Sequence, residues 1–231
     1  MTTVKQTIIL LTLTVLGLTS CKQKQTTEIR DDFKRYYDQF NVDGSFVLYD
    51  PQDDKYVFYN QNQFEQTFSP ASTYKICNSL IGLETGVIKD ENFVIPWDSV
   101  TRQNPNWNAD TSGGIDKFWL TGGLRISPKQ QIDFLKRLHE NQLPFSQRSV
   151  DIVKNIMIAK DTLDYVVRAK TGWCGQDNKD IGWYVGYLET NNKVYYFANC
   201  IQSSDINNKD FANARIDIVY LILKELKLID Q

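Results

Sequence analysis

A serine and a lysine stand three positions apart in the run Ser72-Thr73-Tyr74-Lys75. Residues i and i+3 share a face of an α-helix, so the lysine amine would reach the serine hydroxyl. A neutral amine, or a base built on that amine, can take the hydroxyl proton and create a nucleophile. The same spacing is also common on a solvated helix face, so the tetrad by itself leaves both interpretations open.

The surroundings of the tetrad favour the catalytic interpretation. Apolar residues at helical spacing predict a buried helix over residues 72–83, and we expect this helix to draw Lys75 inside, where burial lowers the pKa of an amine. Lys170-Thr171-Gly172 follows at the end of a predicted strand. There an ammonium, a hydroxyl and a backbone without a neighbouring Cβ can bind a carboxylate.

The order of the predicted elements, strands then helices then strands then a helix, indicates an α+β domain. The sheet is expected to be antiparallel, with helices at both ends of the chain flanking it and a helical subdomain inserted between its halves. Predicted strands occupy residues 45–50, 55–59, 164–170, 181–189 and 193–200, with a tight turn at Asn191-Asn192. Predicted helices occupy residues 72–83, 128–140, 151–159 and 212–228; Ser127, Pro128 and Gln130 form the start signal of the second.

The N-terminus has the features of an export signal. Residues 1–20 contain a positive Lys5 and an apolar run from Ile8 to Leu18, and a lipobox-like sequence ends at Cys21. Lipidation of Cys21 would hold the protein on the membrane, on the periplasmic side of a bacterial envelope. An ordinary secretory signal with a chance cysteine is the alternative. We divide the remainder into a polar tether, residues 21–31, and one domain, residues 32–231.

Composition excludes several classes of function. The 231 residues carry a formal charge of −2 from 26 basic and 28 acidic side chains, so there is no single-sign field to hold nucleic acid. His139 is the sole histidine, which excludes multi-histidine metal sites and makes a Ser-His-Asp triad unexpected. After Cys21, three cysteines remain (Cys77, Cys174 and Cys200), so at least one thiol is free and one disulfide is possible.

Three blocks of the sequence resemble class D, OXA-type, serine β-lactamases. They are residues 68–86 (FSPASTYKICNSLIGLETG), residues 113–128 (GGIDKFWLTGGLRISP), and residues 170–173 together with 180–187 (DIGWYVGY). The pairing of S-x-x-K before a helix with K-T-G on a strand is shared by serine β-lactamases and penicillin-binding proteins. The resemblance covers most of residues 30–225 and implies hydrolysis of β-lactams, with no metal and no nucleic-acid partner. Oligomeric state is not indicated.

The resemblance also implies roles for individual residues. Ser72 would be the acylated nucleophile, and Lys75 would be the general base after N-carboxylation by carbon dioxide. The other implied roles are a carbamate-holding indole at Trp119, substrate binding at Lys170, Thr171 and Gly172, a carboxylate partner at Arg215, and an oxyanion hole formed by the backbone N–H groups of Ser72 and Trp173. Without the resemblance, Trp119 and Trp173 would be interpreted as packing residues and Arg215 as a surface residue.

Two motifs of the family are absent from their expected place after the tetrad. These are S-x-V, whose serine relays protons, and Y-G-N on a nearby loop. The flanking blocks meet at Asn108-Ala109-Asp110, which indicates an internal deletion of several tens of residues. We therefore expect weakened activity. The alternatives are a penicillin-sensing protein that is acylated without turnover, a peptidoglycan transpeptidase or carboxypeptidase, and an inactive deletion variant.

Overall fold

The computed structural model describes residues 25–94, 96, 99, 118–120, 122–190 and 192–230. The signal segment, Cys21, the expected junction at residues 108–110 and Asn191 lie outside these residues. Within them, no helix is long and apolar enough to cross a membrane.

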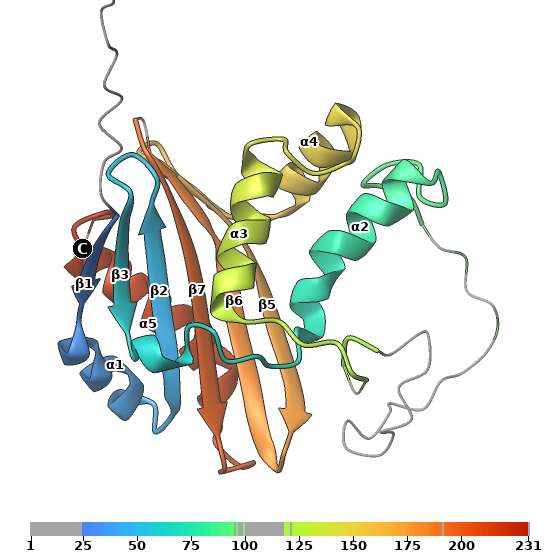
Figure 1. Cartoon of the computed structure of the whole chain (residues 1–231). Coiled ribbons are helices and arrows are strands. Elements are labelled where there is room, and N and C mark those ends of the chain that lie inside the picture. Colours follow the sequence, from blue (N-terminus) through green and yellow to red (C-terminus); the bar gives the residue numbers. More distant parts are fainter. Residues whose placement is uncertain are drawn as a thin grey trace, which may run out of the picture.

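A seven-stranded sheet in the order β1-β3-β2-β7-β6-β5-β4 forms the centre of the fold (Figure 1). The strands are β1 (Thr26–Ile29), β2 (Asp43–Asp50), β3 (Lys55–Tyr59), β4 (Ile158–Asp161), β5 (Tyr165–Gln176), β6 (Lys179–Thr190) and β7 (Val194–Ser203). All neighbours are antiparallel except β1, which pairs in parallel with β3. The prediction of a polar tether over residues 21–31 is therefore wrong in part. Residues 26–29 form a strand that extends the edge of the sheet.

Strand β5 continues further than its sequence pattern predicts. Its ladder with β6 runs to the pair Gln176 and Lys179, and the two residues between them, Asp177 and Asn178, have positive φ angles of 52° and 60°. Asp and Asn tolerate this left-handed conformation, which the tight two-residue hairpin turn requires. The motif Lys170-Thr171-Gly172 consequently lies in the middle of a long strand rather than at its end.

The helices are α1 (Lys34–Gln39), α2 (Lys75–Glu84), α3 (Pro128–His139), α4 (Gln147–Ile156) and α5 (Phe211–Glu225). The start of α3 is confirmed: Ser127 and Gln130 form a reciprocal capping box. Helix α4 begins and ends earlier than expected, because Ser146 caps it and residues 158–161 become the edge strand β4. A 3-10 turn, η3 (Ala71–Tyr74), precedes α2, so Ser72 lies before the regular helix.

The sheet separates two apolar cores, as α+β architecture requires. One core packs α1 and α5 against one face, with Phe211, Ile218 and Ile222 fully buried. The other packs α2, α3 and α4 against the opposite face, around Leu80 and Leu135. Figure 1 shows α3 crossing one face of the sheet while α5 lies behind it.

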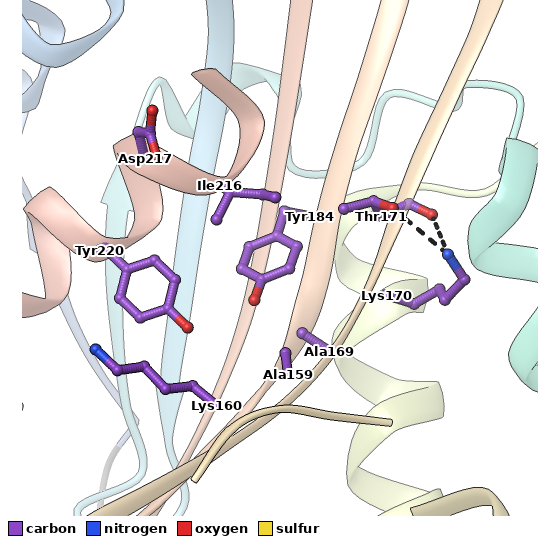
Figure 2. A pocket seen from close by; sticks show the side chains of 9 residues that line it. All are labelled: Ala159, Lys160, Ala169, Lys170, Thr171, Tyr184, Ile216, Asp217 and Tyr220. Carbon is purple, nitrogen blue, oxygen red and sulfur yellow. Dashed lines mark hydrogen bonds between the residues drawn. The ribbon is translucent and has the colours of Figure 1, made fainter. Parts of the chain in front are cut away.

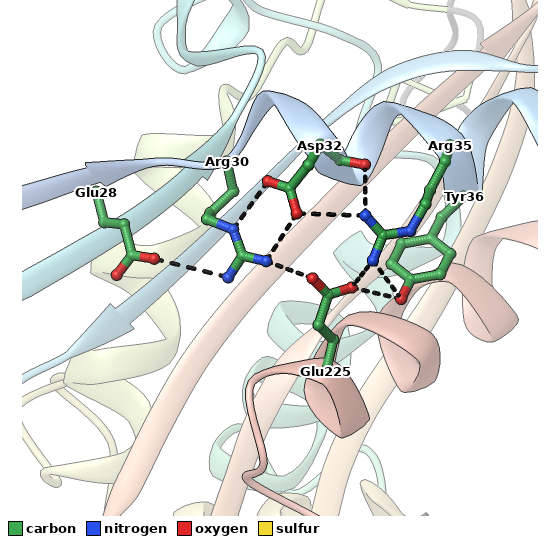
Figure 3. A network of polar contacts seen from close by, with 6 residues as sticks. All are labelled: Glu28, Arg30, Asp32, Arg35, Tyr36 and Glu225. Atoms are coloured by element: carbon green, nitrogen blue, oxygen red, sulfur yellow. Dashed lines mark hydrogen bonds and ion pairs between the residues drawn. The ribbon is translucent and has the colours of Figure 1, made fainter.

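A network of charged residues joins residues 28–36 to the C-terminal helix α5 (Figure 3). Glu225 of α5 contacts Arg30, Arg35 and the hydroxyl of Tyr36. Asp32 binds Arg30 through both of its carboxylate oxygens, at 2.9 and 2.8 Å. This network holds β1 and α1 against α5, so the first and last elements of the described residues belong to the same folded unit.

A second charged cluster predicts how stability depends on pH. Hydrogen bonds from His139 first, and then from Arg168, hold the pKa of the Glu189 carboxyl below its usual range. Because the pKa is lower in the folded state, this contribution is full above the ordinary carboxyl range and disappears as pH falls through the lowered value. We expect Glu189→Gln to reduce the free energy of unfolding by about 1 kcal/mol at pH 7 and by nearly nothing near pH 3, measured by urea denaturation.

Glu65→Gln is the matched control for that measurement. Glu65 also pairs with a cation, Lys129, at 2.7 Å, but its side chain is 73% exposed. We expect almost no change in stability at either pH. A loss at pH 7 equal to that of Glu189→Gln would contradict the assignment.

Candidate active site

The chain segment before Ser72 is held by the sheet. The N–H of Ser69 donates to Oε1 of Gln176 at 2.8 Å, and its carbonyl accepts from Nε1 of the fully buried Trp183 at 2.9 Å. The Ser69 hydroxyl donates to the carbonyl of Trp119 at 2.9 Å. Both backbone groups and the side chain of one residue are therefore satisfied, which fixes the approach of the chain to Ser72.

Backbone strain lies directly beside the candidate nucleophile. Ala71 is fully buried and has a φ of 49°, a left-handed conformation that is uncommon for a residue with a Cβ. Its N–H donates to the Trp119 carbonyl at 3.0 Å, which helps to hold it there. Ser72 follows on the 3-10 turn, half-buried, and its hydroxyl makes no hydrogen bond to any described residue. Such strain is typical of sites where one side chain must be presented in one orientation.

The other side of the turn is held by a buried pair of polar side chains. Gln131 of α3 donates to the Thr73 hydroxyl at 3.0 Å, and this hydroxyl donates to the carbonyl of Pro70 at 2.7 Å. The turn also lies directly against β5. A Cβ placed on Gly172 would stand 3.0 Å from the Pro70 carbonyl oxygen and 3.1 Å from Cγ2 of Thr73. The K-T-G motif and the S-x-x-K motif are thus in contact through a position that only glycine fills without displacement.

Lys75 does not lie where the sequence pattern predicts. The buried face of α2 is taken by Ile76, Leu80 and Leu83, and Lys75 is exposed at the first position of the helix. The expectation that the apolar helix would draw Lys75 inside is therefore wrong. Position 75 is turned by roughly 100° from position 76, so the packing that buries Ile76 directs Lys75 to a different side.

Trp119 lies beside the turn that bears Ser72. Its ring stacks on that of Tyr74 with 5.4 Å between centroids, and its carbonyl accepts the two hydrogen bonds from Ser69 and Ala71. Within the described residues its indole N–H donates no hydrogen bond to Lys75. In the structure, Trp119 stabilises the backbone before Ser72 through its carbonyl oxygen.

Lys170 and Thr171 lie side by side on β5 (Figure 2). The Lys170 amine donates to the carbonyl of Thr171 at 3.1 Å and approaches its hydroxyl at 3.4 Å, directed away from Tyr184 and Tyr220. Burial lowers the pKa of Lys170, and the positive charges of Lys75 and then Arg215 lower it further. A cavity of about 460 Å³ adjoins this strand on the α5 side, lined in part by Thr171, Tyr184 and Tyr220.

Arg215 reaches the same strand from α5. Its Nη1 donates to the carbonyl of Gly172 at 2.7 Å, and its Nε donates to the carbonyl of Ala212 at 3.0 Å. It forms no ion pair with a described residue, and burial lowers the pKa of its guanidinium. The Arg215 Cζ lies 5.6 Å from the ring centre of Trp173, so the structure brings Arg215, Trp173 and Gly172 together.

Several residues of this site were assigned no role from the sequence. Ser69, Gln131, Gln176 and Trp183 all support the turn that bears Ser72, and none of them was predicted to do so. The available signals were the positions of Ser69 and Trp183 inside blocks that resemble the family, and the apolar residues around Trp183. The three remaining cysteines (Cys77, Cys174 and Cys200) are free thiols, and no group of metal-ligating residues occurs within the described ranges.

The sequence and the fold match one class of proteins. A sequence profile described as the penicillin binding protein transpeptidase domain matches residues 44–116 and 104–224. The β-lactamase OXA-48 of Klebsiella pneumoniae is 34% identical over 234 aligned residues, covering 84% of this chain and 87% of that protein. The chain therefore belongs to the class D β-lactamase family.

Solved structures place the fold in the same family. The class D β-lactamase YbXI from Nostoc is 40% identical with a TM-score of 0.76, covering 85% of this chain and 99% of that one. The C-terminal domain of the Bacillus licheniformis BlaR penicillin receptor is 26% identical with a TM-score of 0.77, covering 90% of this chain and 99% of that domain. Relatives of this chain thus include both an enzyme and a receptor.

Proposed function

We propose that this protein hydrolyses the amide bond of β-lactam antibiotics through an acyl-enzyme on Ser72. The observation that carries this proposal is the grouping of Lys75, Lys170 and Arg215 beside the strained turn. None of the three forms an ion pair with a described residue, and the charges of Lys75 and Arg215 act on Lys170. Two half-buried cations, Lys170 and Arg215, together with the exposed Lys75 next to a serine, suit a substrate that carries a carboxylate.

In this proposal each side chain has one task. Arg215 and Thr171 receive the substrate carboxylate and Lys170 orients it, while Gly172 keeps β5 close to the turn that bears Ser72. The Ser72 oxygen attacks the lactam carbonyl carbon, and the N–H groups of Ser72 and Trp173 stabilise the developing oxyanion. The lactam C–N bond then breaks, the ring nitrogen takes the proton removed from Ser72, and water hydrolyses the resulting ester.

Lys75 is the proposed general base, as a carbamate formed by its neutral amine and carbon dioxide, with Trp119 as the indole donor. The exposure of Lys75 supports a refinement of this role. A carbamate in water lacks the dry surroundings that favour it, so we propose that it forms incompletely and limits the hydrolysis of the acyl-enzyme.

We further propose that the chain lacks the family segment that carries S-x-V and Y-G-N. The two profile matches overlap at residues 104–116, which include the expected junction at residues 108–110. The alignment with OXA-48 also spans 234 positions while including 84% of a 231-residue chain, so gaps open within this chain. Both observations support the loss of the segment that carries S-x-V and Y-G-N in the family.

A second function is favoured by the receptor-like relative. If deacylation fails, the protein binds penicillin covalently and retains it, as a sensing domain would; the similarity to the BlaR penicillin receptor supports this alternative. In either case we propose that residues 1–20 are removed and Cys21 is lipidated, which would place the domain at the periplasmic face of a membrane.

Time-resolved intact-mass spectrometry with benzylpenicillin tests the proposal. We expect one adduct that forms and then decays, and that decays several-fold faster when bicarbonate is added, because bicarbonate supplies carbon dioxide to Lys75. A persistent adduct insensitive to bicarbonate would favour the receptor function. No adduct at all would overturn both, and would support an inactive deletion variant.

A further inference from the structure

The indole of Trp173 is held at three points although the side chain is 41% exposed. Its Nε1 donates to Oδ1 of Asp180 at 2.8 Å, a hydrogen bond to a charged acceptor. Its ring centre lies 5.3 Å from that of Phe211 and 5.6 Å from the Arg215 guanidinium carbon. An exposed tryptophan would otherwise exchange between rotamers, so the bond to Asp180 selects one of them.

The guanidinium of Arg215 depends on that ring. Its stem crosses Gly182 of β6, where an added Cβ would stand 2.7 Å from Arg215 Cδ. Gly182 is also the cross-strand partner of Trp173, so the stem and the ring meet on one stretch of sheet. The tip of Arg215 has only the carbonyls of Gly172 and Ala212 as hydrogen-bond partners among the described residues. The ring face of Trp173 restricts the orientation of the remaining N–H groups of the Arg215 guanidinium.

Asp180 therefore acts on Arg215 indirectly. It lies at the start of β6, partly buried, and no ion pair joins it to Arg215 in the structure. Its carboxylate is engaged by the indole, which leaves the guanidinium charge free for a ligand. Within the described residues, the contact of Asp180 in this region is therefore with the indole of Trp173, and Trp173 in turn contacts Arg215.

We propose that Asp180 is a positioning residue for the substrate carboxylate, acting through Trp173 on Arg215, and that it sets the preference for β-lactams with a free carboxylate. The inference rests on the proposed function, in which Arg215 receives that carboxylate. It assigns to Asp180 an effect on recognition and none on the bond-making step, because Asp180 contacts neither Ser72 nor Lys75.

The test compares acylation of Asp180→Ala, Asp180→Asn and wild type by benzylpenicillin and by its methyl ester. For the alanine variant we expect the half-saturation concentration for benzylpenicillin to rise about tenfold, with the limiting acylation rate unchanged. The ester, which lacks the carboxylate, should react alike with wild type and variant. Asp180→Asn keeps an oxygen that accepts from the indole N–H, so it should restore wild-type values.

Two further variants keep the test independent of folding. Lys179→Ala, at an exposed neighbouring position, should behave as wild type. In a Trp173→Phe background, which has no indole N–H, Asp180→Ala should add nothing further.

Three results would overturn the inference alone: equal acylation by Asp180→Ala and wild type, an equal loss with the ester, or an asparagine variant as impaired as alanine. A wild-type protein that forms no adduct would instead overturn the proposed function, and this inference with it.

Discussion

Replacing Ser72 with alanine is expected to abolish the covalent adduct with benzylpenicillin and to lower hydrolysis by at least about 10³-fold. The Ser72 hydroxyl is the proposed nucleophile, and its oxygen forms the ester that every later step requires. Intact-mass spectrometry measures the adduct, and hydrolysis of a chromogenic cephalosporin measures turnover. The melting temperature should stay unchanged, because this hydroxyl makes no hydrogen bond to any described residue.

Ser79→Ala is the matched control. Ser79 is a half-buried serine on the same helix, one position before the buried Leu80. Its loss should leave the adduct intact. An adduct that persists on Ser72→Ala would show that another residue is acylated, and the assignment of the nucleophile would be wrong.

Gly172→Ala is expected to lower the acylation rate by about 10²-fold while the protein still folds. The new Cβ would stand 3.0 Å from the Pro70 carbonyl oxygen, 3.1 Å from Thr73 Cγ2 and 3.2 Å from Trp183 Cβ. Two of these atoms belong to the turn that presents Ser72, so the turn must move away from β5. Rate constants for adduct formation measure the effect, and we expect the free energy of unfolding to fall by about 1–3 kcal/mol.

Gly123→Ala is the control for the added methyl group. A Cβ at Gly123 would meet no atom of a described residue within 4 Å, so neither acylation nor stability should change. If Gly172→Ala acylates at the wild-type rate, contact between the two motifs is not what aligns Ser72.

Local chemistry in the sequence was enough to predict most elements of the fold. The capping box of Ser127 and Gln130 and the aromatic and β-branched runs of β2 and β3 depend on neighbours in the chain. The end of β5 was missed because its turn, Asp177-Asn178, follows a strand pattern interrupted by glycines. The strand β1 was missed because four mostly polar residues form a strand only when β3 supplies the partner.

The sequence by itself predicted which residues carry the chemistry: the spacing of S-x-x-K and the K-T-G motif predicted them from residue types, and the family resemblance added Arg215. Their types define what each group can donate, accept or attack, and this does not depend on the fold. Only the tertiary structure decided how they are held. Ser69 meets Trp183 across 114 positions and Thr73 meets Gln131 across 58, and such contacts exist only once the sheet and α3 have packed. The same packing left Lys75 exposed, because a helix buries one face and the apolar residues occupied it.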